Sequence, residues 1–255
     1  IYMNKILITG GSGLIGSVLN NHLKEKYKLV NLDIKKPISH SQDTIIGNMN
    51  ILEDVKIASE SADTIIHLGA VINVDSDWEL VLKNNIESTR NVYEAAKINN
   101  VKKVIFASSN HAVGLFENDS PYKEIVEGKY EGLDPKNIKK VDKNVPIRPD
   151  SYYGVSKSYG EAIGRYYYET FNIKSINLRI GTVLNSDDPS TSIRHFATWL
   201  SHRDISQLVE KSIIHNVEFE IFYGVSNNKW RFWDIEDSQK KISYMPVDNA
   251  EEYRK

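Results

Sequence analysis

A phenol and an ammonium group stand four residues apart in the segment YGVSK, as Tyr153 and Lys157. Residues at i and i+4 of a helix share one face, so these two side chains would lie side by side. Tyr152 is five residues from Lys157 and would point about 140° away from it. Tyr153 is therefore the candidate base. A free tyrosine has a pKa of about 10, so activity near neutral pH requires this pKa to be lower by roughly 3 units, which corresponds to about 4 kcal/mol.

The same spacing recurs at Tyr93 and Lys97, inside a long amphipathic segment, where we interpret it as a surface or packing pair. The spacing alone is therefore weak evidence, and the context favours Tyr153. This residue follows the polar segment FASSNHAVG (106–114) and precedes the segment RIGT (179–182).

FASSNHAVG places Ser109, Asn110 and His111 directly after an apolar run. Serines alone commonly cap the end of a strand, and a single histidine is more often structural than a ligand. Together with YGVSK in the same cleft, these side chains favour a functional role in binding and orienting a polar substrate.

The segment TGGSGLIG (9–16) contains the pattern G-x-G-x-x-G between a predicted strand and a predicted helix. Glycines allow a tight turn and let the backbone approach a pyrophosphate at the helix N-terminus. Asp33 ends the next predicted strand, where a carboxylate accepts hydrogen bonds from ribose hydroxyls and repels a 2′-phosphate. The pattern predicts dinucleotide binding, with NAD favoured over NADP, although Lys35 and Lys36 could hold that phosphate. The alternative is a glycine-rich turn without a ligand.

The elements that must position these residues alternate in type along the chain. Apolar runs with β periodicity occur at 5–10, 28–33, 44–47, 64–70, 102–109 and 174–181, and helical spacing occurs at 14–26, 51–61, 78–100 and 151–171. Alternating strands and helices predict an α/β fold, a Rossmann-type doubly wound parallel sheet. Ligands bind beyond the carboxyl ends of such strands, so the segments 67–70, 108–111 and 179–182 should meet in one cleft.

We expect residues 3–181 to form the dinucleotide-binding domain and residues 182–255 a small C-terminal substrate-binding lobe, both integrated in one compact unit. The lobe contains a predicted helix near 204–214 and a predicted strand at 218–224, and its tryptophans are interpreted as packing residues. The polar region 115–150 has four prolines and is predicted to be a long loop with one helical turn. A loop of that length is usually functional or mobile.

Composition excludes several other classes of protein. The formal net charge is −2 and no basic stripe is present, so no nucleic-acid partner is expected. The absence of cysteine excludes disulfides and thiolate nucleophiles. No apolar run approaches the ~20 residues of a membrane span, and the seven histidines lack metal-ligand spacing. We expect a cytoplasmic protein without a metal.

TGGSGLIG, Asp33, HLGA, Asn85 in NNIEST, FASSN and YGVSK occur in the order typical of one family. Over residues 3–200 the chain resembles the extended short-chain dehydrogenase/reductase family. The resemblance implies that Tyr153 is the acid/base, that Lys157 lowers its pKa and holds the nicotinamide ribose, and that Ser109 bonds the reacting oxygen. Asn85 would hold the architecture of the site.

The same resemblance implies NAD as the cofactor. Its contacts would come from Gly10, Gly13, Leu14, Ile15, Gly16, Asp33, Asn48, Met49, Leu68, Gly69, Ala70, Asn85, Tyr153, Lys157 and Ile180. One departure is GNMN (47–50), where the family usually has Gly-Asp; Asn48 can still bond the adenine edge.

A narrower resemblance, to the uronate dehydrogenases, rests on FASSNHAVG, LRIGT, TWLSHRD and GVSNNKWRFWD. It implies oxidation of a free hexuronic acid, such as galacturonate or glucuronate, at C1 to the aldarolactone. The implied substrate contacts are Asn73, Ser109, Asn110, His111, Tyr153, Thr182 and, for the carboxylate, Arg194. A guanidinium suits a carboxylate, although Arg194 in its polar segment could be merely solvated. The stretches 183–193 and 115–150 are longer than the resemblance would suggest.

Two other functions fit the same fold. The first is a nucleotide-sugar epimerase or dehydratase that retains tightly bound NAD, and the second is a non-enzymatic NAD-binding regulator. The regulator is disfavoured because it would not need Ser109, Tyr153 and Lys157 together. Proteins of this family often pair through the helix that carries Tyr166, so we expect a homo-oligomer; core packing is the other interpretation of that tyrosine.

Overall fold

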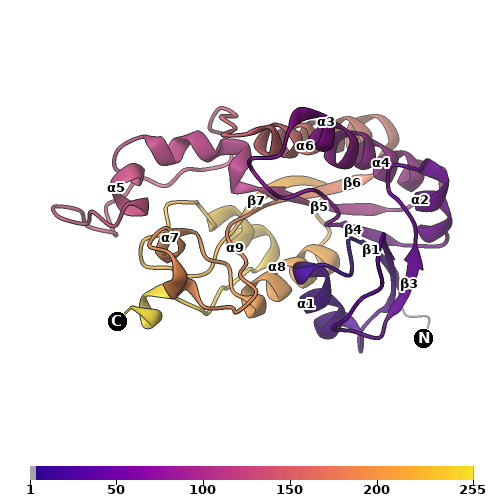
Figure 1. Cartoon of the computed structure of the whole chain (residues 1–255), viewed down its shortest axis with the longest axis horizontal. Helices are drawn as coiled ribbons and strands as arrows, with labels where there is room; N and C mark the ends of the chain where they lie inside the picture. Colours follow the sequence, from indigo (N-terminus) through magenta and orange to yellow (C-terminus); the bar gives the residue numbers. More distant parts are fainter. Residues whose placement is uncertain (1–3, 255) are drawn as a thin grey trace.

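The computed structural model describes residues 4–254, so residue 3, where the first domain was predicted to begin, lies outside the described residues. The described chain forms one sheet (Figure 1). Its strands are Lys5–Thr9 (β1), Lys28–Asp33 (β2), Asp43–Ile46 (β3), Thr64–His67 (β4), Lys103–Ser109 (β5), Lys174–Ile180 (β6) and Phe219–Gly224 (β7).

The sheet has the strand order β3-β2-β1-β4-β5-β6-β7, and all neighbouring strands run parallel. Strands that are covered on both faces need apolar side chains throughout, and β5, with the sequence KVIFASS, is buried along its whole length. The order reverses between β1 and β4, which creates the crevice where doubly wound sheets bind ligands. The predicted fold class is confirmed.

The helices connect the strands in the predicted alternation. They are Leu14–Leu23 (α1), Leu52–Ala58 (α2), Trp78–Val81 (α3), the π-helix Leu82–Glu87 (η1), Ser88–Ile98 (α4), the 3₁₀ segment Asn110–Asn118 (η2), Tyr122–Val126 (α5), Tyr152–Phe171 (α6), the 3₁₀ turn Pro189–Thr191 (η3), His195–Thr198 (α7), His202–Ile214 (α8), Glu236–Ile242 (α9) and the 3₁₀ turn Ala250–Tyr253 (η4). Within residues 4–254, no helix combines the length and the apolar character needed to cross a membrane.

Two apolar cores flank the sheet. On one face, Val55 of α2, Val92 of α4 and Tyr167 of α6 belong to a single buried cluster. On the other face, Leu19 of α1 and Leu208 of α8 belong to a second cluster. Figure 1 shows the resulting three layers, with α2, α4 and α6 above the sheet and α1 and α8 below it. These layers hold the carboxyl ends of the strands along one edge.

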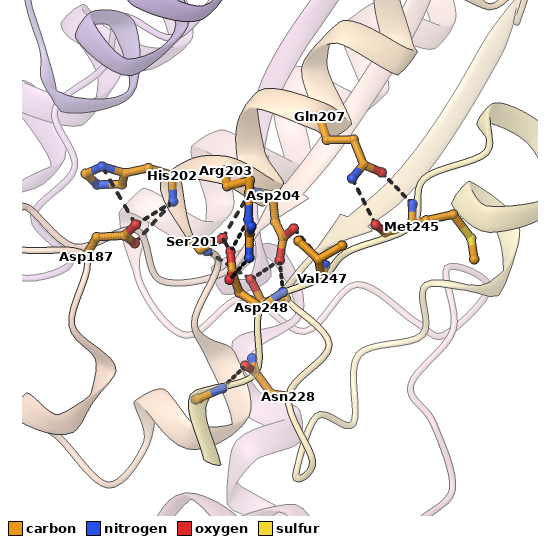
Figure 2. Close-up of polar contacts among 12 residues, drawn as sticks. Asp187, Ser201, His202, Arg203, Asp204, Gln207, Asn228, Met245, Val247 and Asp248 are labelled. Atoms are coloured by element: carbon orange, nitrogen blue, oxygen red, sulfur yellow. Dashed lines mark hydrogen bonds and ion pairs between the residues drawn. The ribbon is translucent and has the colours of Figure 1, made fainter. Parts of the chain in front are cut away.

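The C-terminal part of the chain is joined to the same sheet, because β7 pairs with β6. Its last segment is also attached to the start of α8 (Figure 2). The buried carboxylate of Asp204 accepts hydrogen bonds from Ser226 Oγ at 2.6 Å, Val247 N at 2.9 Å and Asp248 N at 3.1 Å. Three charge-assisted hydrogen bonds to one buried group fix this connection.

The region 115–150 packs against the C-terminal lobe rather than projecting as a loose loop. It contains the end of η2 and all of α5, so it has more helical structure than the single predicted turn. Val141 forms a parallel bridge with Trp233, and the ring of Tyr130 stacks on Trp230 with centroids 4.2 Å apart. The interpretation of both tryptophans as packing residues is confirmed, since each is at most 7% exposed.

Candidate active site

The glycine-rich turn between β1 and α1 is shaped by its contact with the loop after β4. Gly10 has a φ of +69°, and a Cβ added there would lie 2.8 Å from the Cα of Gly69. A side chain at this position would be strained and would also collide with backbone. Gly13 is the N-cap of α1 and offers no side-chain cap, so the first-turn N–H groups are available to an anion. This cradle fits a dinucleotide pyrophosphate.

Asp33 ends β2 beside this turn. Its carboxylate accepts hydrogen bonds from the backbone N–H groups of Ser12, at 3.0 Å, and Lys35, at 3.2 Å. These bonds fix the carboxylate next to the glycines, where it can accept hydrogen bonds from ribose hydroxyls. Lys35 also lines the cavity, so the residue that could attract a 2′-phosphate lies beside the one that would repel it.

A cavity of 710 Å³ runs along the carboxyl ends of β1, β2, β4, β5 and β6. The predicted residues that line it are Gly10, Gly13, Leu14, Ile15, Gly16, Asp33, Asn48, Met49, Leu68, Gly69, Ala70, Ser109, His111, Tyr153, Lys157, Ile180, Thr182 and Arg194. The three sequence segments expected to converge therefore do so. We call the part lined by Ser109, His111, Tyr153, Thr182 and Arg194 the catalytic end of the cavity.

Three predicted residues, Asn73, Asn85 and Asn110, are not among those that line the cavity. Asn73 is exposed in the loop after β4. Asn110 is buried at the start of η2, and its Nδ2 has no hydrogen-bond partner among residues 4–254. An unpaired buried donor is costly, so this amide is poised to meet a ligand group or a water.

Asn85 lies in the π-helix η1 and connects the loop after β4 to α6. Its Oδ1 accepts a hydrogen bond from Val71 N at 2.8 Å, and its Nδ2 donates to Ser156 Oγ at 3.0 Å. Ser156 Oγ in turn donates to the carbonyl oxygen of Tyr153 at 2.7 Å. Short π-helices often occur at functional sites. Asn85 is thus linked to the backbone of Tyr153 through Ser156, and its architectural role stays a prediction.

Tyr153 and Lys157 lie one turn apart at the start of α6, and both are almost fully buried. The ammonium of Lys157 lies 5.3 Å from the centre of the Tyr153 ring and donates a hydrogen bond to the carbonyl oxygen of Ala107 at 2.7 Å. Ser109, at the end of β5, caps η2 by accepting from His111 N at 3.2 Å. The three predicted catalytic side chains are therefore brought together by β5 and α6.

The predicted lowering of the Tyr153 pKa by Lys157 stays a prediction, and burial acts against it. Burial raises the pKa of Tyr153 to about 12, and a hydrogen bond with Ser109 only partly opposes the rise. Burial also lowers the pKa of Lys157 to about 7. Both pKa shifts have the same cause, because burial disfavours the charged form of each group when the other group is uncharged.

His111 is fixed by a residue that the sequence analysis did not identify. Its Nδ1 lies 2.7 Å from Oδ2 of Asp150, and its ring meets the ring of Tyr153 edge-on at 5.6 Å. Burial alone would raise the pKa of Asp150, but the hydrogen bond and charge of His111 outweigh it and hold that pKa below its ordinary value. The sequence signal was the aspartate in RPD, just before YYGVSK.

Arg194 lines the cavity as predicted, but its guanidinium already has a carboxylate partner. Nε donates to Glu117 Oε2 at 2.6 Å and Nη2 donates to Glu117 Oε1 at 2.7 Å. Nη1 donates to Thr182 Oγ1 at 3.1 Å. Glu117 belongs to η2 and was not identified from the sequence, because nothing in FENDS distinguishes it from a solvated glutamate.

Comparison with known proteins identifies the family. The model of the NAD dependent epimerase/dehydratase family matches residues 6–238. The chain belongs to this family. Among its relatives in the epimerase/dehydratase family is the NAD-dependent glucose-6-phosphate dehydrogenase of Haloferax volcanii, which is 32% identical over 97% of this chain and 95% of the relative. The uronate dehydrogenase of Pseudomonas putida is also 32% identical, over 98% of this chain and 87% of the relative.

A solved structure of the same family supports this assignment. The crystal structure of a mutant uronate dehydrogenase from Agrobacterium tumefaciens, complexed with NAD, superposes with a TM-score of 0.82. It is 27% identical, and the match covers 99% of this chain and 88% of that chain. The protein is an NAD-dependent dehydrogenase, with NAD as its cofactor. Within residues 4–254, no three His, Cys, Asp or Glu side chains are grouped so that they could hold a metal ion.

Proposed function

We propose that the protein oxidises a free sugar at its anomeric carbon, converting the cyclic hemiacetal to a lactone. The observation that carries this proposal is the placement of Ser109, Tyr153 and Lys157 at one end of a cavity whose other end is the glycine cradle. NAD, held at the glycine cradle, would supply the acceptor for the hydride from C1. The proton of the C1 hydroxyl goes to Tyr153, so the loss of a hydride and a proton balances the two-electron oxidation.

The chain's own residues position the sugar and move the proton. Ser109 and Tyr153 hold the C1 hydroxyl, and general-base catalysis by Tyr153 raises the rate by about 10²–10⁴-fold. His111, held at Nδ1 by Asp150, presents its other ring nitrogen for a second hydroxyl. Orientation by these groups is the larger contribution to the rate.

The first candidate substrate is a free hexuronic acid such as galacturonate or glucuronate. The similarity to uronate dehydrogenases supports it, as does the guanidinium of Arg194 at the catalytic end. The second candidate is a neutral aldose. This alternative is favoured by one observation, the bidentate pairing of Arg194 with Glu117. In both candidates the sugar is free rather than attached to a nucleotide.

The deciding experiment mixes the purified protein with NAD and a panel of free sugars and follows NADH absorbance. The panel contains glucuronate, galacturonate, glucose, galactose, arabinose and glucose 6-phosphate. Prompt NADH formation with any of them, which is lost in Tyr153→Phe, supports C1 oxidation. If no free sugar gives NADH and NAD stays bound through purification, the epimerase or dehydratase alternative is favoured.

Two expectations from the sequence stay predictions at this point. They are the cytoplasmic location and the self-association of the chain.

A further inference from the structure

Each cationic or potentially cationic group at the catalytic end of the cavity is paired with a carboxylate of the chain. Arg194 binds Glu117 through two parallel hydrogen bonds, at 2.6 and 2.7 Å. His111 lies 2.7 Å from a carboxylate oxygen of Asp150. Bidentate guanidinium–carboxylate pairs are among the strongest polar contacts in proteins. A substrate would therefore meet paired charges there.

Glu117 is held in place by its neighbours in η2. Its side chain is only 13% exposed. On one side of it, Phe116 lies under the guanidinium of Arg148, 4.5 Å from the ring centre. On the other side, Asp119 forms an ion pair with the same Arg148. The backbone N–H of Leu115 also donates to the carbonyl oxygen of Arg148 at 3.0 Å. Glu117 thus belongs to a braced segment rather than to a freely moving loop.

The other cations around the cavity are not placed to receive a substrate carboxylate. In the described part of the chain, the lysines and arginines that line the cavity are Lys35, Lys157 and Arg194. Lys35 is next to Asp33, at the glycine turn. Lys157 lies beneath the catalytic tyrosine and donates to the Ala107 carbonyl. Of these three, Arg194 is the one at the catalytic end, and a substrate anion bound there would meet the carboxylate of Glu117 at the same place.

We propose that the Glu117–Arg194 pair selects a neutral aldose and discriminates against uronates and sugar phosphates. This inference rests on the proposed oxidation at C1. A hydroxymethyl group can donate to the Glu117 carboxylate and accept from a remaining N–H of Arg194, whereas a carboxylate can only accept. The carboxylate of a bound uronate would lie beside the carboxylate of Glu117, and the repulsion between them would weaken its binding. Selectivity of this kind needs no change in the catalytic groups.

The test compares sugars that differ only at C6. We would measure kcat/KM with NAD for glucose against glucuronate, and for galactose against galacturonate. We expect the wild-type protein to favour the neutral member of at least one pair by tenfold or more. A preference for the uronate in both pairs overturns the inference but leaves the proposed function intact. No NADH with any free sugar overturns both.

Glu117→Gln removes the charge but keeps the shape of the side chain. It should raise the ratio of kcat/KM for the uronate to that for the matched aldose by tenfold or more. Glu117→Asp keeps the charge and should keep the wild-type preference. The matched control is Glu127→Gln, which removes the carboxylate of an exposed ion pair with Lys129 away from the cavity lining, and should leave the ratio unchanged. An equal ratio in Glu117→Gln and wild type overturns the inference, and the wild-type comparison alone decides it should Glu117→Gln fail to fold.

Discussion

The ammonium of Lys157 and the phenol of Tyr153 lie one helical turn apart, yet the ammonium donates its hydrogen bond to the carbonyl of Ala107. Each group is buried in surroundings that disfavour its charged form, which raises the pKa of Tyr153 and lowers the pKa of Lys157. If both became charged together, each would compensate the other. The site therefore holds the pair ready without ionising the tyrosine in advance.

Replacing Lys157 with Met should stabilise the ligand-free protein in a pH-dependent way. Folding lowers the pKa of Lys157 from 10.5 to about 7, so the folded protein binds fewer protons between these values and its stability rises with pH across that window. The pKa shift corresponds to a destabilisation of about 5 kcal/mol, which the substitution relieves. The substitution also removes the hydrogen bond to Ala107, which costs about 2 kcal/mol. We expect Lys157→Met to raise the free energy of unfolding by about 3 kcal/mol at pH 6.5.

The measurement is urea unfolding of both proteins without NAD, at pH 6.5 and at pH 9.5. The gain in stability should be largest at pH 6.5 and mostly gone at pH 9.5. As the pH approaches 10.5, the amine loses its charge in the unfolded protein too, so keeping it uncharged in the folded protein costs less. The same difference at both pH values would contradict the burial of a neutral amine.

Tyr153→Phe should abolish turnover while leaving the cofactor site intact. The phenol oxygen is the group that takes the proton, and loss of a general base typically costs 10²–10⁴-fold in kcat. The matched control is Tyr152→Phe, because Tyr152 is 53% exposed and outside the set of residues that line the cavity. Steady-state kinetics and NAD titration by calorimetry check this. A regulator rather than an enzyme would show no turnover in either protein.

The fold was predictable from the sequence because central strands of this sheet, such as β4 and β5, are buried along their whole length. TIIH and KVIFASS each contain a short apolar run, II and VIFA, and the segments between the strands show helical spacing. The glycine cradle was also predictable, because its glycines have the spacing of a tight turn before a helix, and Gly10 adopts a φ of +69° that glycine reaches without strain. Local conformational demands of this kind are visible in the sequence itself.

The pairing of charges in the site was not predictable in the same way. Glu117 and Arg194 are 77 residues apart, and Asp150 is 39 residues from His111. Nothing in a single sequence indicates which of its many glutamates and aspartates will face a given cation. The region 115–150 was misjudged for a related reason, since its packing depends on distant aromatic residues such as Trp230 and Trp233.

Asp33→Ala should weaken the preference for NAD over NADP. The carboxylate would accept hydrogen bonds from ribose hydroxyls and repel a 2′-phosphate. Without it, Lys35 remains beside the cavity and would attract that phosphate. We expect the ratio of kcat/KM for NAD to that for NADP to fall at least tenfold. The control is Asp43→Asn, an exposed carboxylate at the start of β3. An unchanged ratio in Asp33→Ala would remove this residue from cofactor selection.

Asp204→Ala should detach the C-terminal segment from α8. The substitution removes three hydrogen bonds to a fully buried carboxylate, one from Ser226 and two from the backbone of Val247 and Asp248, and Figure 2 shows Asp204 beside these last two residues. Leaving buried donors unpaired is expensive, so we expect a loss of about 3 kcal/mol in the free energy of unfolding. Arg203→Ala is the control, because its ion pair with Asp248 is exposed and should contribute less than about 1 kcal/mol. Urea unfolding measures both, and equal losses would contradict the role of Asp204.

Asp150→Asn should impair the use of the sugar but not of NAD. The carboxylate holds Nδ1 of His111, and its lowered pKa keeps it charged throughout the neutral range. An asparagine leaves the imidazole less firmly oriented, and a small misplacement of a substrate-positioning group can cost up to about 10²-fold. We expect kcat/KM for the preferred sugar to fall ten- to a hundredfold, while the KM for NAD changes less than twofold. The control is Asp134→Asn, an exposed carboxylate elsewhere in the 115–150 region. Equal kinetics in the two variants would show that Asp150 only stabilises the fold around His111.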